Sequence, residues 1–257
     1  LLFSIAGADL GQVKASKSIA YFADVSYDIT DRLTVGAGTR YFEDDRDIQS
    51  SGITSKETFD KLSSNATLSF AATSNVNLYM RVAEGFRSGG FNPATAPVPT
   101  FDPETLISYE AGVKARLLES RLYAELSLFY SDYSDYQAFF VNLSGQGFTA
   151  NPGEAEIKGL EWNLQWVATQ QLSLGFSGNL TDTEFTKING SLTRIKGDPL
   201  DFVPEYSYSV NADYSFAWSN DIAGFVRLAY NRQGKSSYVD RSSAPGQEVA
   251  DSKPISL

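Results

Sequence analysis

Apolar and polar residues alternate one by one along most of this chain. The segment 206–216 shows the pattern most clearly, because serine, asparagine and aspartate separate its tyrosine, valine, alanine and phenylalanine residues. Residues 33–41, 122–130 and 160–166 alternate in the same way. Alternation over about eight to twelve residues predicts a β-strand with one apolar face and one polar face.

Ten such strands are expected, and they are long compared with the roughly five or six residues usual in soluble proteins. We place them near 18–29, 32–42, 60–72, 76–87, 105–116, 121–134, 155–168, 171–183, 203–217 and 221–233.

The segments between these strands alternate in length. Short turns are expected at 30–31, 73–75, 118–120, 169–170 and 218–220. Long polar segments lie between them, near 43–59, 88–104, 135–154, 184–202 and 234–252. Short turns at one end and long loops at the other are typical of a bacterial outer-membrane barrel. The pattern therefore predicts an all-β protein, part of a transmembrane antiparallel β-barrel with short periplasmic turns and long extracellular loops.

Composition agrees with a barrel. No stretch approaches the roughly 18 apolar residues of a membrane helix, whereas a barrel strand needs only about ten residues of alternating character. Aromatic residues form 13% of the chain and gather near strand ends, at pairs such as Tyr41 with Phe42 and Tyr130 with Tyr133. Such placement is typical of interfacial girdles. The alternative is a soluble sandwich with these rings in its core, but the regular polar faces require a wet lumen or bulk solvent.

The chemistry of the chain excludes several function classes. It contains neither histidine nor cysteine, and its formal net charge is −10 at pH 7. Ser-His-Asp catalysis is impossible without histidine, and the negative charge argues against nucleic acid as a partner. The acidic run at 43–47 lacks the spacing of an EF-hand loop, so we expect a solvated loop there. We expect no catalytic residues, no metal ligands and no cofactor.

Five short motifs follow one another along the chain. They read TDRLTVGAGTRY at 30–41, EGFRSGGFN at 84–92, YEAGVK at 109–114, FYSDYSDYQ at 129–137 and IKGLE at 157–161. In this order and spacing they resemble the TonB-dependent outer-membrane receptors, and the resemblance spans about residues 18–257. Each motif alone is weakly specific, but the ordered set is highly specific.

The resemblance implies a barrel of roughly 22 strands around a globular plug, with import energy supplied by the TonB complex through a box near the receptor's N-terminus. Residues 1–257 would then form part of the barrel domain, without the plug, the early strands or the last strands. The first residue is Leu1 and the sole methionine is Met80, so we expect the natural start elsewhere. The implied location is the bacterial outer membrane, crossed many times, with outer-membrane lipid around the barrel.

Alternation also predicts which side chains point into the lumen. Charge is tolerated there, whereas it costs about 2–4 kcal/mol on the lipid face at mid-membrane. The residues expected to line the lumen against the plug are Arg40, Arg81, Glu110, Lys114, Glu125, Glu161, Asn163 and Gln165.

Candidates for substrate contact lie in or beside the long loops. They are Phe86, Arg87, Phe91, Tyr136, Phe139, Phe140 and Phe148. For the motif at 84–92 we favour a bend at the barrel rim over direct ligand contact, with Gly85, Gly89 and Gly90 permitting the turn.

The expected ligand is a ferric siderophore or a similar chelate, which supplies the metal's ligands itself and so requires no histidine. The alternatives are a receptor for another bulky nutrient, such as cobalamin, haem or an oligosaccharide, and a passive porin-like barrel. A barrel enzyme is a further alternative, but it would usually need a base that this chain lacks.

Overall fold

A computed structural model gives the fold of the chain. The structure describes residues 12–50, 53–142, 144–189, 195–219, 222–238, 250–251 and 255–256. Among these residues, none belongs to a helix long and apolar enough to cross a membrane.

Ten long strands dominate the described residues. Their bounds are β1 Gln12–Thr30, β2 Leu33–Ser50, β3 Ile53–Thr73, β4 Val76–Arg87, β7 Glu104–Leu117, β8 Leu122–Val141, β9 Gly147–Val167, β10 Leu172–Ile188, β11 Tyr206–Ser219 and β12 Ile222–Gln233. Five strands contain two residues each. They are β5 Gly90–Phe91, β6 Thr100–Phe101, β13 Ser237–Tyr238, β14 Ala250–Asp251 and β15 Ile255–Ser256.

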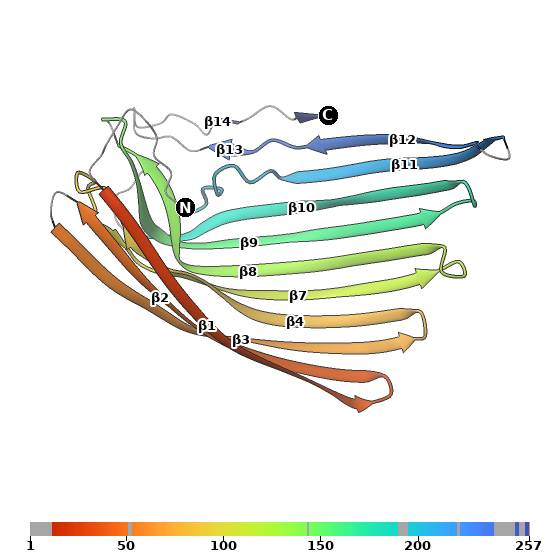
Figure 1. Cartoon of the computed structure of the whole chain (residues 1–257), viewed down its shortest axis with the longest axis horizontal. Coiled ribbons are helices and arrows are strands. Elements are labelled where there is room, and N and C mark those ends of the chain that lie inside the picture. The colour runs from red at the N-terminus through yellow and green to blue at the C-terminus, as the bar shows by residue number, and fades with distance from the viewer. Residues whose placement is uncertain are drawn as a thin grey trace.

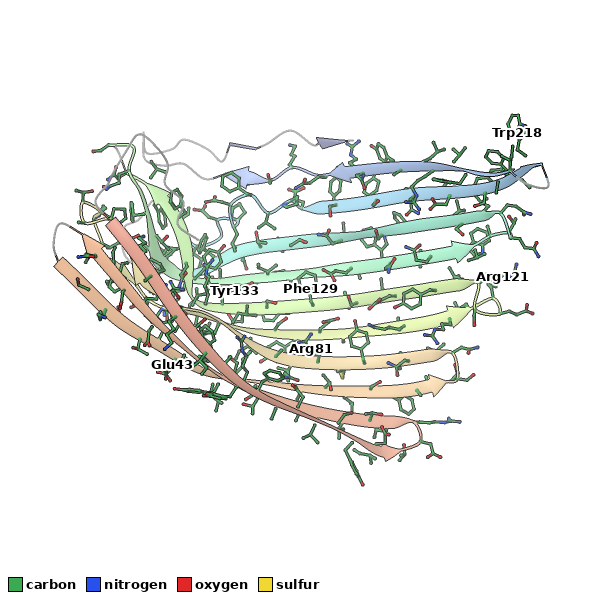
Figure 2. The ribbon with its side chains drawn as sticks, in the orientation of Figure 1. Glu43, Arg81, Arg121, Phe129, Tyr133 and Trp218 are labelled. Carbon is green, nitrogen blue, oxygen red and sulfur yellow. The ribbon has the colours of Figure 1, made fainter. Side chains whose placement is uncertain are left out.

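The long strands form one antiparallel sheet in chain order, with β15 added beside β12. Figure 1 shows them side by side in a curved sheet, with the tight turns at the right and the longer connections at the left. Arg121 and Trp218 lie at the end with the tight turns, the short-turn end, whereas Glu43 and Tyr133 lie toward the opposite, long-loop end (Figure 2). This arrangement confirms the predicted all-β antiparallel fold. Within the described residues β1 and β15 do not pair with each other, so the sheet is open.

The predicted strands were too short at the long-loop end. Most of the loop expected at 43–59 belongs to β2 and β3, which pair from Leu33↔Phe70 to Ser50↔Ile53. Most of the loop expected at 135–154 belongs to β8 and β9, which pair as far as Val141↔Gly147. Charged and irregular residues hid these extensions, because strands beyond the membrane need no apolar face. Residues 190–194 and 239–249, inside two other expected loops, lie outside the described residues.

The two faces of the sheet differ in polarity, as the alternation predicts. One face, here called the apolar face, exposes large hydrophobic side chains to the surroundings. Examples are Val25, Met80, Leu128, Tyr214 and Leu228, which are 49–70% exposed. The opposite face, here called the polar face, carries the intervening residues. Two aromatic residues assigned to the girdles, Phe42 and Tyr133, lie on the polar face, since their cross-strand partners include Lys61 and Ala155.

On six of the ten long strands, charge first appears on the apolar face at a similar height. Counted from the short-turn end of each strand, the first charged residue comes eight to ten residues along β2, β4, β8, β9, β10 and β12. These residues are Glu43, Glu84, Asp132, Lys158, Asp182 and Arg232. A transmembrane β-strand needs about 9–11 residues, so the apolar band below them has the height of a bilayer core.

Candidate ligand site at the long-loop end

The motif at 84–92 leads from β4 into the connection to β7, and a compact hydrogen-bond network holds its base. Arg87 Nη2 donates to Glu104 Oε2 at 2.7 Å and to the Gln137 carbonyl at 2.8 Å. The Gln137 backbone N–H donates to the same carboxylate oxygen at 2.6 Å. Glu104 is only 7% exposed. This network, the loop clamp (Arg87, Glu104 and Gln137), joins three strands whose sequence motifs lie far apart.

The Gln137 side chain extends the clamp to the loop backbone. Its Nε2 donates to the carbonyls of Ser88 at 3.0 Å and Asp102 at 2.9 Å, at the two ends of the connection. Farther along, Asn92 pairs with Thr149 of β9: its Oδ1 accepts from the Thr149 N–H at 2.8 Å and its Nδ2 donates to the Thr149 carbonyl at 2.7 Å. The connection is therefore held against β8 and β9.

The same connection is tied to β2 on its other side. Arg46 Nη1 donates to the Gly89 carbonyl at 2.6 Å, and Arg46 Nε donates to Asp44 Oδ2 at 2.7 Å. Asp44 is buried; burial alone would raise the pKa of its carboxyl, but hydrogen bonds from Ser16, Arg46 and Ser88 outweigh it and lower that pKa. The expected solvated loop at 43–47 was therefore wrong, because this run is a strand whose Asp44 anchors the loop.

The glycines of the motif have a different role from the predicted one. None of Gly85, Gly89 and Gly90 has a positive φ, so none is needed for a left-handed turn. A Cβ on Gly89 would lie 2.5 Å from the Phe101 carbonyl, and one on Gly90 would lie 2.8 Å from the Phe101 ring. Glycine is required here because the backbone passes so close to its neighbours.

A pocket of about 440 Å³ lies where the connection, β1, β2, β8 and β9 meet. Its aromatic walls come from Phe91, Phe101, Phe139 and Phe148. Two cations, Lys14 and Arg46, share the lining with the acid Asp47. Lys14 Nζ also donates to the Phe91 carbonyl at 3.2 Å. The pocket thus combines apolar rings with the Lys14 ammonium and with an Arg46 guanidinium that is already paired with Asp44.

Three of the seven predicted contact residues meet in this pocket, namely Phe91, Phe139 and Phe148. Phe139 is 64% exposed, whereas Phe148 is largely buried and stacks on Phe140 with ring centroids 5.7 Å apart. Phe140 packs in the same buried cluster, away from the pocket lining.

The remaining candidates lie elsewhere. Tyr136 packs edge-on against Phe185 at 5.6 Å, and burial raises the pKa of Tyr136 to about 12. Arg87 belongs to the loop clamp. Phe86 contacts Phe42 with ring centroids 6.2 Å apart, in a separate pocket of about 370 Å³ lined by β1, β2, β3 and β4. Their role in ligand contact stays a prediction.

The structure places all eight predicted lumen residues on the polar face. Residues paired directly across two strands lie on the same face, as in Arg81↔Glu110 and Glu125↔Asn163. They form local groups and no single site: Lys114 Nζ lies 2.9 Å from Glu125 Oε1. Contact of this face with a plug stays a prediction.

Sequence reasoning missed Lys14, Arg46 and Phe101 as pocket residues. Lys14 lies before the first predicted strand, and Arg46 lies in the segment taken for a loop. Extended pairing of β1 with β2, which places Lys14 opposite Ile48 and Ser16 opposite Arg46, brings both cations to the pocket. No local pattern signals that pairing.

The long antiparallel strands, the apolar band and the loop-built pocket define a β-barrel membrane receptor. A family model described as "TonB dependent receptor-like, beta-barrel" matches residues 4–253. The chain belongs to this family, whose members are outer-membrane transport receptors and not enzymes.

Curated relatives agree with that membership. The chain is 27% identical over 202 residues to the pesticin receptor of Yersinia pestis, which covers 74% of this chain and 29% of the relative. It is 30% identical over 172 residues to the metal-pseudopaline receptor CntO of Pseudomonas aeruginosa, covering 65% of this chain and 23% of the relative. The chain therefore spans less than a third of the length of these relatives.

Solved structures share the fold. The ferric yersiniabactin uptake receptor FyuA of Yersinia pestis superimposes with a TM-score of 0.75 over 95% of this chain and 37% of that chain, at 22% identity. The siderophore receptor PiuA of Acinetobacter baumannii gives a TM-score of 0.72 over 95% of this chain and 36% of that chain, at 18% identity.

Proposed function

We propose that the receptor containing this chain binds a ferric siderophore or a similar metal chelate at its extracellular mouth and imports it with energy from TonB. The observation that carries the proposal is the pocket at the long-loop end, in a chain that belongs to the TonB-dependent receptors. The names of the relatives, which include a ferric yersiniabactin receptor and a metal-pseudopaline receptor, support a metal chelate as the ligand.

The chemistry of the pocket fits a chelate better than a bare ion. Its lining contains one carboxylate, Asp47, and the chain has neither histidine nor cysteine. A chelate brings its own donor atoms, so the protein has only to recognise the outside of the complex. Exposed rings such as Phe139 offer stacking surfaces, while the Lys14 ammonium can attract an anionic group of the chelate.

We further propose that the polar face lines the lumen of the complete barrel. Its ion pairs and polar groups would contact a plug domain and the ligand's path, and the apolar face would contact outer-membrane lipid. The domain assignment of residues 1–257 to the barrel, and the contact with TonB through another part of the receptor, belong to the same proposal.

Uptake in whole cells tests the function. Cells with the complete receptor gene intact or deleted, each with and without TonB, would be given a panel of radiolabelled ferric siderophores. We expect uptake of one chelate to disappear in both deletions. Uptake that needs the receptor but not TonB would indicate a passive porin-like barrel. Unchanged uptake of every chelate would overturn the siderophore proposal in favour of cobalamin, haem or an oligosaccharide, which the same cells would then be given.

A further inference from the structure

Arg232 occupies an unusual position at the end of β12. It lies on the apolar face, because its cross-strand partner Tyr208 pairs in turn with Gly178, opposite Trp162. It comes ten residues after Ile222, at the height where charge first appears on this face. Its Nε donates to the Tyr206 hydroxyl at 3.3 Å, and Tyr230 lies two residues before it on the same face of β12. Tyr206 therefore holds this guanidinium at the edge of the apolar band, beside Tyr230.

The polar partners of Arg232 differ from those of Lys158, the comparable cation on β9. Lys158 stands at a similar height on β9, but its Nζ lies 2.8 Å from Glu156 and 3.4 Å from Asp182. Among the residues whose positions the structure describes, no carboxylate lies within ion-pair distance of Arg232. On its other side, β15 places the uncharged residue Ser256 opposite it. A guanidinium has five N–H donors, and the Tyr206 hydroxyl occupies only part of that capacity.

Aromatic rings lie beside Arg232 across the strands and also below it, toward the short-turn end. Tyr208 and Trp162 are level with Arg232, and Tyr230 and Phe176 lie two residues nearer the short-turn end. Tyr208 contacts Tyr230 at 6.1 Å and Phe176 at 6.4 Å, and Phe176 contacts Trp162 at 5.5 Å. Leu228, two residues before Tyr230 on the same face, is 67% exposed. A cation above a wide apolar surface matches a molecule with an anionic head and hydrocarbon chains. Tyrosine and tryptophan rings are typical of this depth in a membrane.

We propose that Arg232, with Tyr206 and Tyr230, binds the phosphate of a lipid headgroup in the outer leaflet, with the acyl chains lying on the part of the apolar face nearer the short-turn end, over Tyr230, Phe176 and Leu228. Arginine suits this task because its planar guanidinium can donate two parallel hydrogen bonds to phosphate oxygens. The site lies on the opposite face of the sheet from the lumen-facing residues, so it is independent of the imported ligand.

Lipid binding by the complete, detergent-purified receptor tests the site. The probe is lipid A carrying its phosphates, and the readout is the bound lipid counted by native mass spectrometry over a concentration series. We expect Arg232→Gln to weaken binding about tenfold, the effect of one charge-assisted hydrogen bond. Arg232→Lys should recover part of the affinity, since it restores the charge without the planar fork.

Arg227→Gln is the matched control, because Arg227 lies on the same strand but faces the other way, paired with Asp213. It should bind lipid A like the unchanged receptor. The proposal is overturned if Arg232→Gln binds phosphorylated lipid A normally, or if Arg227→Gln loses as much. It is also overturned if lipid A stripped of its phosphates binds as tightly, or if inorganic phosphate alone competes fully, since the latter would indicate an anion site without lipid.

Discussion

Glu104→Gln is the change that tests the loop clamp most directly. The substitution keeps the size and shape of the side chain but removes its charge. In the structure Glu104 Oε2 accepts hydrogen bonds from both the Arg87 guanidinium and the Gln137 backbone N–H. The neutral amide oxygen can still accept both donors, but both bonds weaken because the acceptor has lost its negative charge, and the NH₂ group of the amide has to turn away from them.

The magnitude follows from the two bonds. A hydrogen bond to a charged group contributes about 1.5–3 kcal/mol, and a neutral one about 1 kcal/mol. Two weakened bonds would cost about 2–3 kcal/mol, but the Arg87 side chain is 53% exposed, so water screens its share. A loss of about 2 kcal/mol in the free energy of opening the connection is therefore expected. That corresponds to roughly a 30-fold larger opening constant.

Amide hydrogen exchange in the complete receptor measures this quantity. Exchange at the Gln137 amide, and at the Asn92 amide that bonds the Pro99 carbonyl, should become roughly 30-fold faster in Glu104→Gln. Amides in the paired centres of β7 and β8 should not change. Asp102→Asn is the control, because it removes a nearby acid whose backbone carbonyl, not its side chain, accepts the clamp's bond. Unchanged exchange in Glu104→Gln, or equal acceleration in Asp102→Asn, would refute the clamp.

Four further substitutions test the binding and packing roles assigned to aromatic residues. Phe139→Ala should weaken uptake of the cognate chelate about tenfold or more while leaving thermal stability unchanged, because the ring is exposed. Phe140→Ala should instead lower the unfolding temperature, because that ring is buried. The reverse pattern would contradict the positions assigned to the two rings. Phe185→Ala should cost about 3–5 kcal/mol, since the ring is 2% exposed among Ala155 and Leu200, and easier proteolysis beside β10 would show it. The pKa of Tyr136 is about 12 in the folded chain and about 10 in the unfolded chain. Its buried, neutral ring therefore contributes its full stability below pH 10, and that stability is lost as the pH rises toward 12. Protease sensitivity should rise over this pH range, and an identical pH profile for Tyr136→Phe would count against the prediction.

The aromatic stretch in β8 shows where local patterns fail. Period-two reading puts Tyr133 and Tyr136 on opposite faces. A bulge with Asp135 at a φ of 54° shifts the register, so Tyr133 pairs with Ala155 and Tyr136 with Gly153. The two tyrosines therefore meet on one face, with ring centroids 5.6 Å apart. A bulge re-aims every later side chain of its strand, and nothing in the residues around Asp135 announces it.

The motif at 84–92 shows a different limit. Its sequence predicted a bend at the barrel rim. In the structure, Arg87 and Asn92 form internal hydrogen bonds that hold the loop. The partners, Glu104, Gln137 and Thr149, come from other strands. Similarity to a family reveals that such residues belong together, but only their geometry shows that they bond to one another.

The alternation of apolar and polar residues by itself determined the strands, their order, the two faces and the segregation of short turns from long connections. Each of these depends on the period-two geometry of a strand and on neighbours close in sequence. Only the tertiary structure decided where β2, β3, β8 and β9 end, how the bulge redirects β8, and which residues form the pocket. Lys14, Arg46, Phe91 and Phe139 meet there because long-range pairing and the loop clamp bring distant segments together, and no local period encodes such distances.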